Sequence, residues 1–104
     1  FVVSNYSEYI GDEAEAMKTT TGWNDLYSNS LNGNNESGFS ALPAGGRKGR
    51  QIDDGSYYDL GYVANFWTST ERYNFTAYKF SLQWSLGHSD VDKNYGFSVR
   101  CVRD

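Results

Sequence analysis

The side chains with the greatest catalytic potential in this sequence are its single histidine, His88, and its single cysteine, Cys101. His88 would have to serve as the base of any Ser-His-Asp hydrolase. However, Gly87-His88-Ser89 has the composition of an exposed hairpin turn, and no nucleophile-elbow pattern occurs in the chain. Cys101 lies in an apolar, strand-like segment without a histidine near it in the sequence, which favours a buried structural cysteine. The two residues therefore predict a chain that is not an enzyme.

Thirteen carboxylates form a second set of chemically capable groups. A glycosidase needs two of them at a fixed separation, with one in an apolar pocket. The acids that come closest to this requirement are Asp53, Asp54, Asp59 and Glu71. With so many carboxylates some pair can always be drawn, so this pattern does not predict a glycosidase.

Alternating oxygen ligands at Asp90, Asp92 and Asn94 resemble the start of an EF-hand calcium loop. The expected glycine comes one residue late, at Gly96, and no glutamate occupies position twelve of the loop. A polar hairpin turn accounts for the same residues. We expect no cofactor, and a Ca²⁺ site at these three residues is the alternative.

Aromatic residues make up 17% of the chain, and several lie in or beside segments with loop composition. Exposed Tyr and Trp next to polar side chains are typical of sugar-stacking and protein-binding sites, because rings offer rigid contact area at low entropic cost. The candidate ligand-binding residues are Tyr57, Tyr58, Arg72, Tyr73, Asn74, Trp84 and His88. The alternative is that the large rings of the second half belong to the core, namely Trp67, Phe80, Trp84 and Phe97.

The net charge of −4 argues against nucleic-acid binding, which needs a basic face to displace counterions. The one basic cluster, Arg47, Lys48 and Arg50, is flanked by glycines and indicates a solvated loop. No apolar run is long enough to span a membrane. A glycan or a protein is therefore the expected partner.

The first half of the chain predicts one short helix followed by loops. Asn5 and Glu8 have capping-box spacing, so the helix is predicted to start at Tyr6, with a break at Gly11. Its apolar side consists of Tyr9, Ile10, Ala14 and Met17. Residues 19–38 and 44–60 have loop composition, separated by a short extended piece, 39–42, that ends at a proline. The predicted anchors of the first loop are Trp23, Leu26, Tyr27 and Leu31.

The second half predicts strands. Residues 62–69 are β-prone, and apolar side chains alternate with polar ones from Tyr78 to Leu86, which indicates one half-buried strand. A turn is predicted over Asp90–Gly96, followed by a last strand from Phe97 to Cys101. The fold class is therefore α+β, with a short N-terminal helix, long loops and an antiparallel sheet from the C-terminal half.

Four ordered segments resemble the Fibrobacter succinogenes major paralogous (FISUMP) domain. They are Met17 to Asn24, the Asn35–Gly45 segment with Gly-Phe-Ser-Ala-Leu-Pro, Phe66 to Glu71, and the ending Gly96 to Asp104 with Gly-Phe-Ser-Val-Arg-Cys-Val-Arg. The resemblance covers nearly the whole chain, and it implies a fold similar to C-type-lectin-like and sulfatase-modifying-factor domains. One cysteine cannot supply the pair that copper-dependent formylglycine formation requires, so that activity is excluded.

The resemblance also implies a cellular location and a role. Family members are mostly secreted or surface proteins and lipoproteins of Bacteroidetes-type bacteria, so we expect a place outside the cytoplasm, on the exterior of the outer membrane. The expected role is a non-catalytic recognition or adhesion module that binds glycan or protein through a loop-rich aromatic face. The alternative is a structural or assembly module without a ligand site.

The opening of the chain departs from the family pattern. Family domains extend further upstream, where a cysteine is the implied mate of Cys101. We therefore expect residues 1–104 to form a single domain that lacks the family's N-terminal segment. Another chain or an upstream segment would then complete the sheet beside the strand from Phe97 to Arg103.

Overall fold

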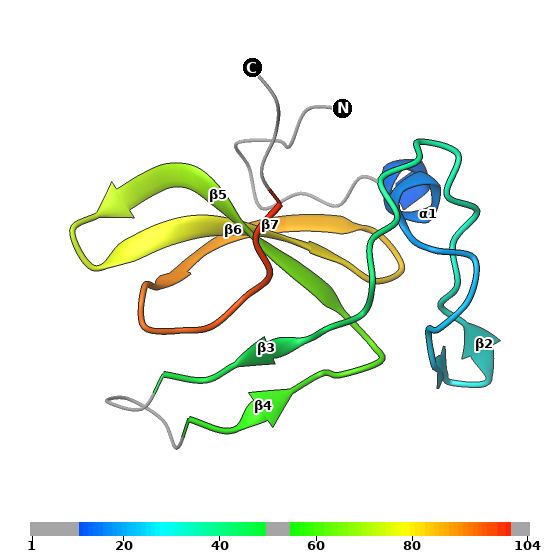
Figure 1. The fold of residues 1–104 in the computed structure, drawn as a ribbon, viewed down its shortest axis with the longest axis horizontal. Helices are drawn as coiled ribbons and strands as arrows, with labels where there is room; N and C mark the ends of the chain where they lie inside the picture. Colours follow the sequence, from blue (N-terminus) through cyan, green and yellow to red (C-terminus); the bar gives the residue numbers. More distant parts are fainter. Residues whose placement is uncertain (1–10, 50–54, 101–104) are drawn as a thin grey trace.

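The computed structural model describes residues 11–49 and 55–100, which form one short helix and three small antiparallel sheets (Figure 1). The predicted combination of a short helix, long loops and an antiparallel C-terminal sheet is confirmed. The elements, in chain order, are α1 (Gly11–Met17), β1 (Asp25–Leu26), β2 (Asn29–Ser30), β3 (Gly46–Arg47), β4 (Tyr57–Tyr58), β5 (Ala64–Tyr73), β6 (Thr76–Leu82) and β7 (Leu86–Asp92).

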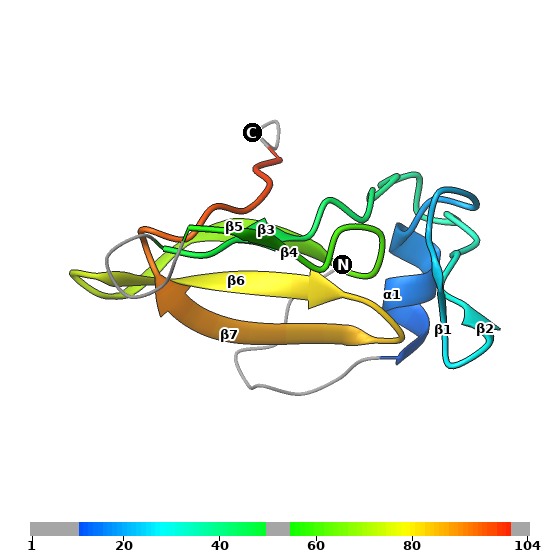
Figure 2. The same cartoon turned by 90° about the horizontal axis from the view of Figure 1, so that it is seen from below.

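The main sheet contains three strands in the order β5-β6-β7. Strands β6 and β7 pair without interruption from Thr76↔Asp92 to Leu82↔Leu86. Strand β5 pairs regularly with β6 only in its first half, and the register shifts between Trp67 and Glu71 and again before Tyr73. Figures 1 and 2 show α1 and the β1–β2 pair at one end of this sheet and the tip of the β5–β6 hairpin at the other.

One face of the main sheet carries the core. Because side chains alternate across a strand, Phe80 and Leu82 on β6 share a face with their partners Phe66, on β5, and Leu86, on β7. The Phe66 and Phe80 rings stack with their centroids 5.1 Å apart. The remaining members of the buried apolar cluster come from α1, the loops and the start of β5, namely Ala14, Met17, Trp23, Leu31, Ala41 and Ala64.

Lys18, which directly follows α1, connects the helical end of the molecule to the main sheet through its side chain. Its ammonium donates a hydrogen bond to the carbonyl oxygen of Gln83, in the β6–β7 turn, and lies 5.2 Å from the Trp23 ring centroid. The helix itself supplies Ala14 and Met17 to the core, as the apolar pattern predicted. The predicted helix start at Tyr6 and its cap lie outside the described residues. Within the described part of the chain, no helix has the length and apolar character needed to cross a membrane.

The strand predicted over Tyr78–Leu86 is wrong, because the chain reverses direction at residues 83–85. Leu82 and Leu86 face each other across the resulting hairpin, so both remain on the core face and the alternation of apolar residues continues through the turn. His88, predicted in a turn, instead lies within β7 opposite Phe80. The predicted Asp90–Gly96 turn also starts too early, since β7 continues to Asp92.

The predicted last strand is also wrong over its described part. Residues 97–100 form no regular strand, and Ser98 makes an isolated parallel bridge to Phe66 on β5. Val99 is exposed, and Cys101 lies outside the described residues. Whether another segment or chain completes the sheet stays a prediction. Among the predicted loop anchors, Trp23 and Leu31 are buried and Leu26 packs against the core, whereas Tyr27 is exposed.

Candidate functional site

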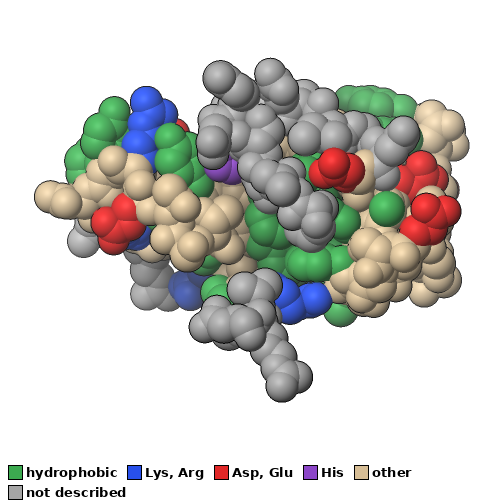
Figure 3. All heavy atoms as spheres, turned by 90° about the horizontal axis from the view of Figure 1, so that it is seen from above, with side chains coloured by type: hydrophobic (Ala, Val, Ile, Leu, Met, Phe, Trp, Pro, Cys, Tyr) green, Lys and Arg blue, Asp and Glu red, His purple; other side chains and the backbone are tan. Residues whose placement is uncertain are grey.

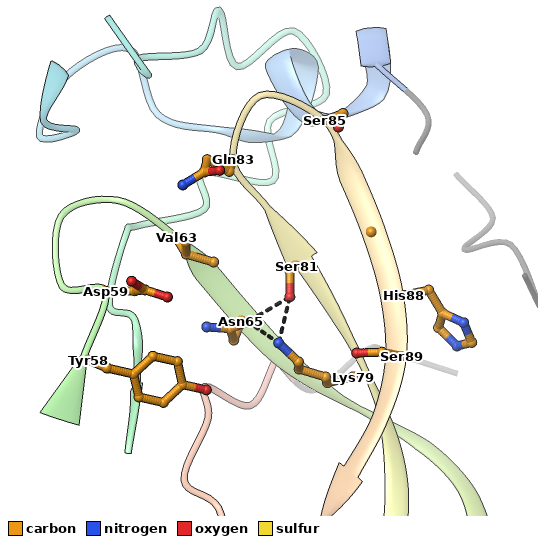
Figure 4. A pocket seen from close by; sticks show the side chains of 11 residues that line it. Tyr58, Asp59, Val63, Asn65, Lys79, Ser81, Gln83, Ser85, His88 and Ser89 are labelled. Carbon is orange, nitrogen blue, oxygen red and sulfur yellow. Dashed lines mark hydrogen bonds between the residues drawn. The ribbon is translucent and has the colours of Figure 1, made fainter. Parts of the chain in front are cut away.

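The face of the main sheet opposite the core forms the floor of a pocket with a volume of about 350 Å³. The alternation that sends Phe80 and Leu82 into the core places Lys79 and Ser81 on this opposite face. We call it the Lys79 pocket, and its lining residues are Tyr58, Asp59, Val63, Asn65, Lys79, Ser81, Gln83, Ser85, Gly87, His88 and Ser89 (Figure 4).

Three polar side chains at the floor of the pocket form a closed hydrogen-bonded triangle (Figure 4). The Lys79 Nζ donates to Asn65 Oδ1 at 2.7 Å and to Ser81 Oγ at 2.9 Å. The Ser81 hydroxyl donates in turn to Asn65 Oδ1 at 2.6 Å. Asn65 Nδ2 donates to the Gly45 carbonyl oxygen at 3.1 Å, which fixes the amide orientation. Each group therefore has a defined role as donor or acceptor.

Among the described residues, the Lys79 ammonium forms no ion pair with a carboxylate. Its two hydrogen-bond acceptors are uncharged, and the ion pairs of the described residues join Arg72 to Asp90 and Lys93 to Glu71 instead. Burial lowers the pKa of Lys79, and the more distant Asp59 carboxylate partly opposes this shift. The ammonium also lies 5.0 Å from the centroid of the Phe97 ring, a favourable cation–π arrangement.

Tyr58 and Asp59 form the wall of the pocket that faces this triangle (Figure 4). Burial raises the pKa of the half-buried Tyr58, and the neighbouring Asp59 and Tyr95 raise it further. The wall can approach the floor because residue 45 is a glycine: a Cβ there would lie 2.1 Å from the Tyr58 carbonyl oxygen, and the φ angle of Gly45 is +65°. The carboxylate of Asp59 supplies the pocket with acceptors, whereas Lys79 supplies donors.

His88 contributes to the pocket without directing its ring into it. The imidazole extends from β7 away from the Lys79–Asn65–Ser81 triangle (Figure 4) and stacks on Tyr78, with the ring centroids 4.6 Å apart. In this position it does not face Ser81 or Asp59. The arrangement of the pocket therefore suits binding through hydrogen bonds, and it does not bring His88 together with a nucleophile.

The other predicted ligand-binding residues do not gather on one face. Tyr57 is 76% exposed and contacts Arg47, whose guanidinium lies 5.5 Å from the ring centroid. Trp84 is 45% exposed at the β6–β7 turn, so the alternative that placed it in the core is wrong. Phe80 is buried, whereas Trp67 and Phe97 are half-buried and pack together with their centroids 4.8 Å apart. Among the predicted ligand-binding residues, Tyr58 is the one that directs its side chain into the Lys79 pocket.

Arg72, Tyr73 and Asn74 lie together at the tip of the β5–β6 hairpin. Phe75, which was not predicted as a site residue, lies beside them. Tyr73 and Phe75 are 52% and 65% exposed, and their stacked rings are 5.9 Å apart. Arg72 lies against the Tyr73 ring and pairs with Asp90 at 3.1 Å. On the face in Figure 3, hydrophobic, basic and acidic side chains occur together at this end of the molecule, and further acidic side chains lie toward the α1 end.

The predicted carboxylate sites are also dispersed. Asp90 pairs with Arg72, and the described residues contain no group of three or more His, Cys, Asp or Glu side chains that could hold a metal ion. The Ca²⁺ alternative at Asp90, Asp92 and Asn94 stays a prediction. Glu71 pairs with Lys93 at 2.6 Å, and Asp59 lies in the wall of the Lys79 pocket. Asp53 and Asp54 lie outside the described residues.

Lys79, Asn65 and Ser81 were not among the site residues predicted from the sequence. A signal for two of them was present, because Lys79 and Ser81 occupy the polar positions of the alternating segment and must therefore share one face of β6. Asn65 gave no such signal, since it lies in a β-prone run, and its partners on β6 follow only from the register of β5 and β6. The site therefore depends on strand pairing that the sequence pattern did not supply.

Comparison with known families gives one match, to the family model described as the Fibrobacter succinogenes major domain, over residues 3–103. Searches of curated proteins and of solved structures found no match. The matched range includes the first three segments on which the resemblance depended, all but the final residue of the fourth, and every described residue of the Lys79 pocket. The chain belongs to the Fibrobacter succinogenes major domain family.

Proposed function

We propose that this domain is a non-catalytic recognition module that binds a glycan in the Lys79 pocket. The observation that carries the proposal is the hydrogen-bonded floor of Lys79, Asn65 and Ser81, which faces a wall containing Tyr58 and Asp59. Sugar hydroxyls both donate and accept hydrogen bonds. The pocket offers them the Lys79 ammonium as a donor, the Asp59 carboxylate as an acceptor, and hydroxyl groups that can do both.

The size and shape of the pocket support a small polar ligand. Its volume of about 350 Å³ lies at the lower end of the range for small-molecule sites. The half-buried Tyr58 adds a rigid ring next to the polar floor, and aromatic rings provide contact area with little entropy to lose. The proposed site lies on a sheet face and therefore differs from the loop-rich aromatic face expected from the sequence.

The family resemblance extends the proposal to fold type and location. We propose a C-type-lectin-like arrangement, which the short helix, the long loops and the antiparallel main sheet support. A role on the bacterial cell surface or in a secreted protein is consistent with family membership. In this setting the domain would serve adhesion or recognition of extracellular polysaccharide.

The adjacent tyrosines of β4 provide a matched test of the site. Tyr58 lines the pocket, whereas Tyr57 contacts Arg47 and is largely exposed. A glycan array with neutral and acidic sugars would identify a ligand, and isothermal titration calorimetry would then measure its affinity for Tyr58→Ala and Tyr57→Ala. We expect Tyr58→Ala to weaken binding about tenfold or more, the equivalent of about 1.4 kcal/mol, and Tyr57→Ala to leave it unchanged.

Two results would contradict the proposal. If Tyr57→Ala abolished binding while Tyr58→Ala did not, the ligand would bind outside the Lys79 pocket. If the wild-type domain bound no glycan on a broad array, with and without Ca²⁺, the alternative of a structural module without a ligand site would be favoured.

A further inference from the structure

The charge balance of the Lys79 pocket indicates which class of glycan it would take. Lys79 donates hydrogen bonds to Asn65 Oδ1 and Ser81 Oγ, both of which are uncharged. A protonated amine has three N–H donors, so one donor has no hydrogen-bond partner in the part of the chain that the structure describes and is available to a ligand. Among the described residues, the ion pairs do not include Lys79. The floor of the pocket therefore presents a positive charge that no described carboxylate pairs with directly.

The surroundings of Lys79 make this charge more effective than a lysine on the surface. The side chain is half-buried, burial lowers its pKa, and the Phe97 ring lies against the ammonium. An ion in such a site has lost part of its hydration, so an anionic ligand group gains more from it than from a fully hydrated ammonium. Hydrogen bonds between ionised partners are also about twice as strong as those between neutral groups.

Asp59 is the other charged side chain that lines the pocket, and it limits the ligands that fit. Its carboxylate lies in the wall near Tyr58, outside ion-pair distance of Lys79. A ligand with several negative charges would be repelled by Asp59, whereas hydroxyl groups would donate hydrogen bonds to it. The pocket thus suits a molecule with one negative charge at one end and hydroxyl groups at the other.

We infer that the Lys79 pocket selects sugars that carry a carboxylate, the uronic acid class, with the carboxylate on Lys79 and ring hydroxyls near Asp59. This inference depends on the proposed function, because it names the ligand class of the same pocket. Uronic acids have one negative charge and several hydroxyls on a single ring, as the arrangement of Lys79 and Asp59 requires. The negative net charge of the whole chain gives no general attraction for anions, so the preference must come from this pocket.

The test uses pairs of ligands that differ in one group. Methyl glucuronide and methyl galacturonide would be compared with methyl glucoside and methyl galactoside by calorimetry or by chemical-shift titration at moderate ionic strength. We expect the wild-type domain to bind at least one acidic member about tenfold more tightly than its neutral counterpart, as one charge-assisted hydrogen bond would provide. Lys79→Met should reduce this ratio to about one.

Lys93→Met is the matched control, because Lys93 pairs with Glu71 and does not line the Lys79 pocket. It removes the same charge from the chain and should leave the ratio unchanged. Equal affinity of the wild type for acidic and neutral sugars would overturn this inference while leaving the proposed function intact. Failure to bind any sugar of either kind, on the array or in solution, would overturn both. The wild-type comparison decides the question even if Lys79→Met fails to fold.

Discussion

At the scale of single residues, Lys79 is a group whose burial opposes folding and whose position suits binding. The folded chain withdraws its ammonium from water and supplies neutral acceptors in return. Replacing a desolvated charged side chain by an apolar one of similar volume often costs a protein no stability. Removing the hydrogen-bond partners while the charge remains costs much more. Substitution of Lys79 should therefore change the free energy of unfolding much less than substitution of the residues that accept its hydrogen bonds.

The lowered pKa of Lys79 predicts a specific dependence of stability on pH. The unfolded chain holds the Lys79 proton up to about its usual pKa of 10.5, whereas the folded chain releases it at lower pH. Stability therefore rises with pH between these two values, because the unfolded state binds more protons there. We expect the free energy of unfolding of the wild type to increase relative to that of Lys79→Met as the pH rises toward 10.5.

Urea denaturation of both proteins over this range measures the difference. Lys18, whose pKa burial also lowers, and Tyr58, whose pKa burial raises, titrate in both proteins and largely cancel. Asp59 opposes the effect by favouring the charged form of Lys79. A difference that stays constant with pH would show that the Lys79 ammonium is not desolvated in the folded domain.

Of the three residues in the triangle, Asn65 should contribute most to the stability of the domain, because both other side chains donate hydrogen bonds to it. It is 1% exposed, accepts hydrogen bonds from Lys79 and Ser81, and donates one to Gly45. Asn65→Leu removes all three bonds at similar volume, and it should destabilise the domain by about 3 kcal/mol, since buried partners lose their hydrogen bonds. In the Lys79→Met background the cost should be smaller by about 1 kcal/mol. Purely additive effects in this double-mutant cycle would contradict the coupling.

At the scale of elements, the β6–β7 hairpin shows where the sequence pattern misleads. The turn at residues 83–85 contains Gln, Trp and Ser, with no Gly, Asn or Pro to mark it. Leu82 and Leu86 lie opposite each other, so the alternation continues through the turn and resembles one long strand. Gly87-His88-Ser89 has turn composition but lies in β7, because its pairing with β6 outweighs local preference.

The position of the β6–β7 turn predicts that alanine substitution at two neighbouring apolar residues will have very different costs in stability. Leu82 is fully buried, so Leu82→Ala should cost about 2–5 kcal/mol through lost burial and the cavity left behind. Trp84 is half exposed at the turn, and Trp84→Ala should cost about 1 kcal/mol or less. Urea denaturation of both variants makes the comparison. Equal costs would indicate that Trp84 belongs to the core, as a single strand over Tyr78–Leu86 would require.

At the scale of the whole molecule, isolated bridges join segments that are far apart in sequence. Gly45 bridges to Ala64, Arg47 to Gly96, and Phe66 to Ser98. The fold class, the buried ring of Phe80 and the buried side of α1 could be predicted from composition and periodicity, whereas the burial of Phe66 in place of Trp67 was not predicted. These bridges could not be predicted, because each joins two segments that are distant in sequence, and neither segment carries a pattern that indicates its partner. The floor of the Lys79 pocket depends on the same kind of long-range contact, because Asn65 donates a hydrogen bond to Gly45 and pairs with Ser81 across β5 and β6.

Two glycines with similar backbone angles test how closely these segments must approach. The φ angles of Gly45 and Gly38 are +65° and +75°, but a Cβ at Gly45 would meet the Tyr58 backbone at 2.1 Å, whereas one at Gly38 would meet nothing within 4 Å. Gly38→Ala should cost about 1 kcal/mol through backbone strain alone. Gly45→Ala should cost about 3 kcal/mol or more and should also weaken glycan binding, because the Tyr58 wall must move.

Thermal and urea unfolding would compare the two variants, and calorimetry would compare their ligand affinities. A similar, small cost for both substitutions would mean that β3 and β4 can separate without consequence. In that case the wall of the pocket would not be fixed by its backbone, and the preference for one ligand class would need another origin.

The interlocked bonds of Lys79, Asn65 and Ser81 also have a consequence for the history of the family. A lineage that no longer needs the ligand has no reason to keep a half-buried ammonium, and substitution of an apolar residue at position 79 would then be tolerated or selected. Once the lysine is lost, selection no longer maintains its two acceptors. We therefore expect the three positions to be inherited and lost together, so that family members divide into those that have the whole triangle and those that have none of it.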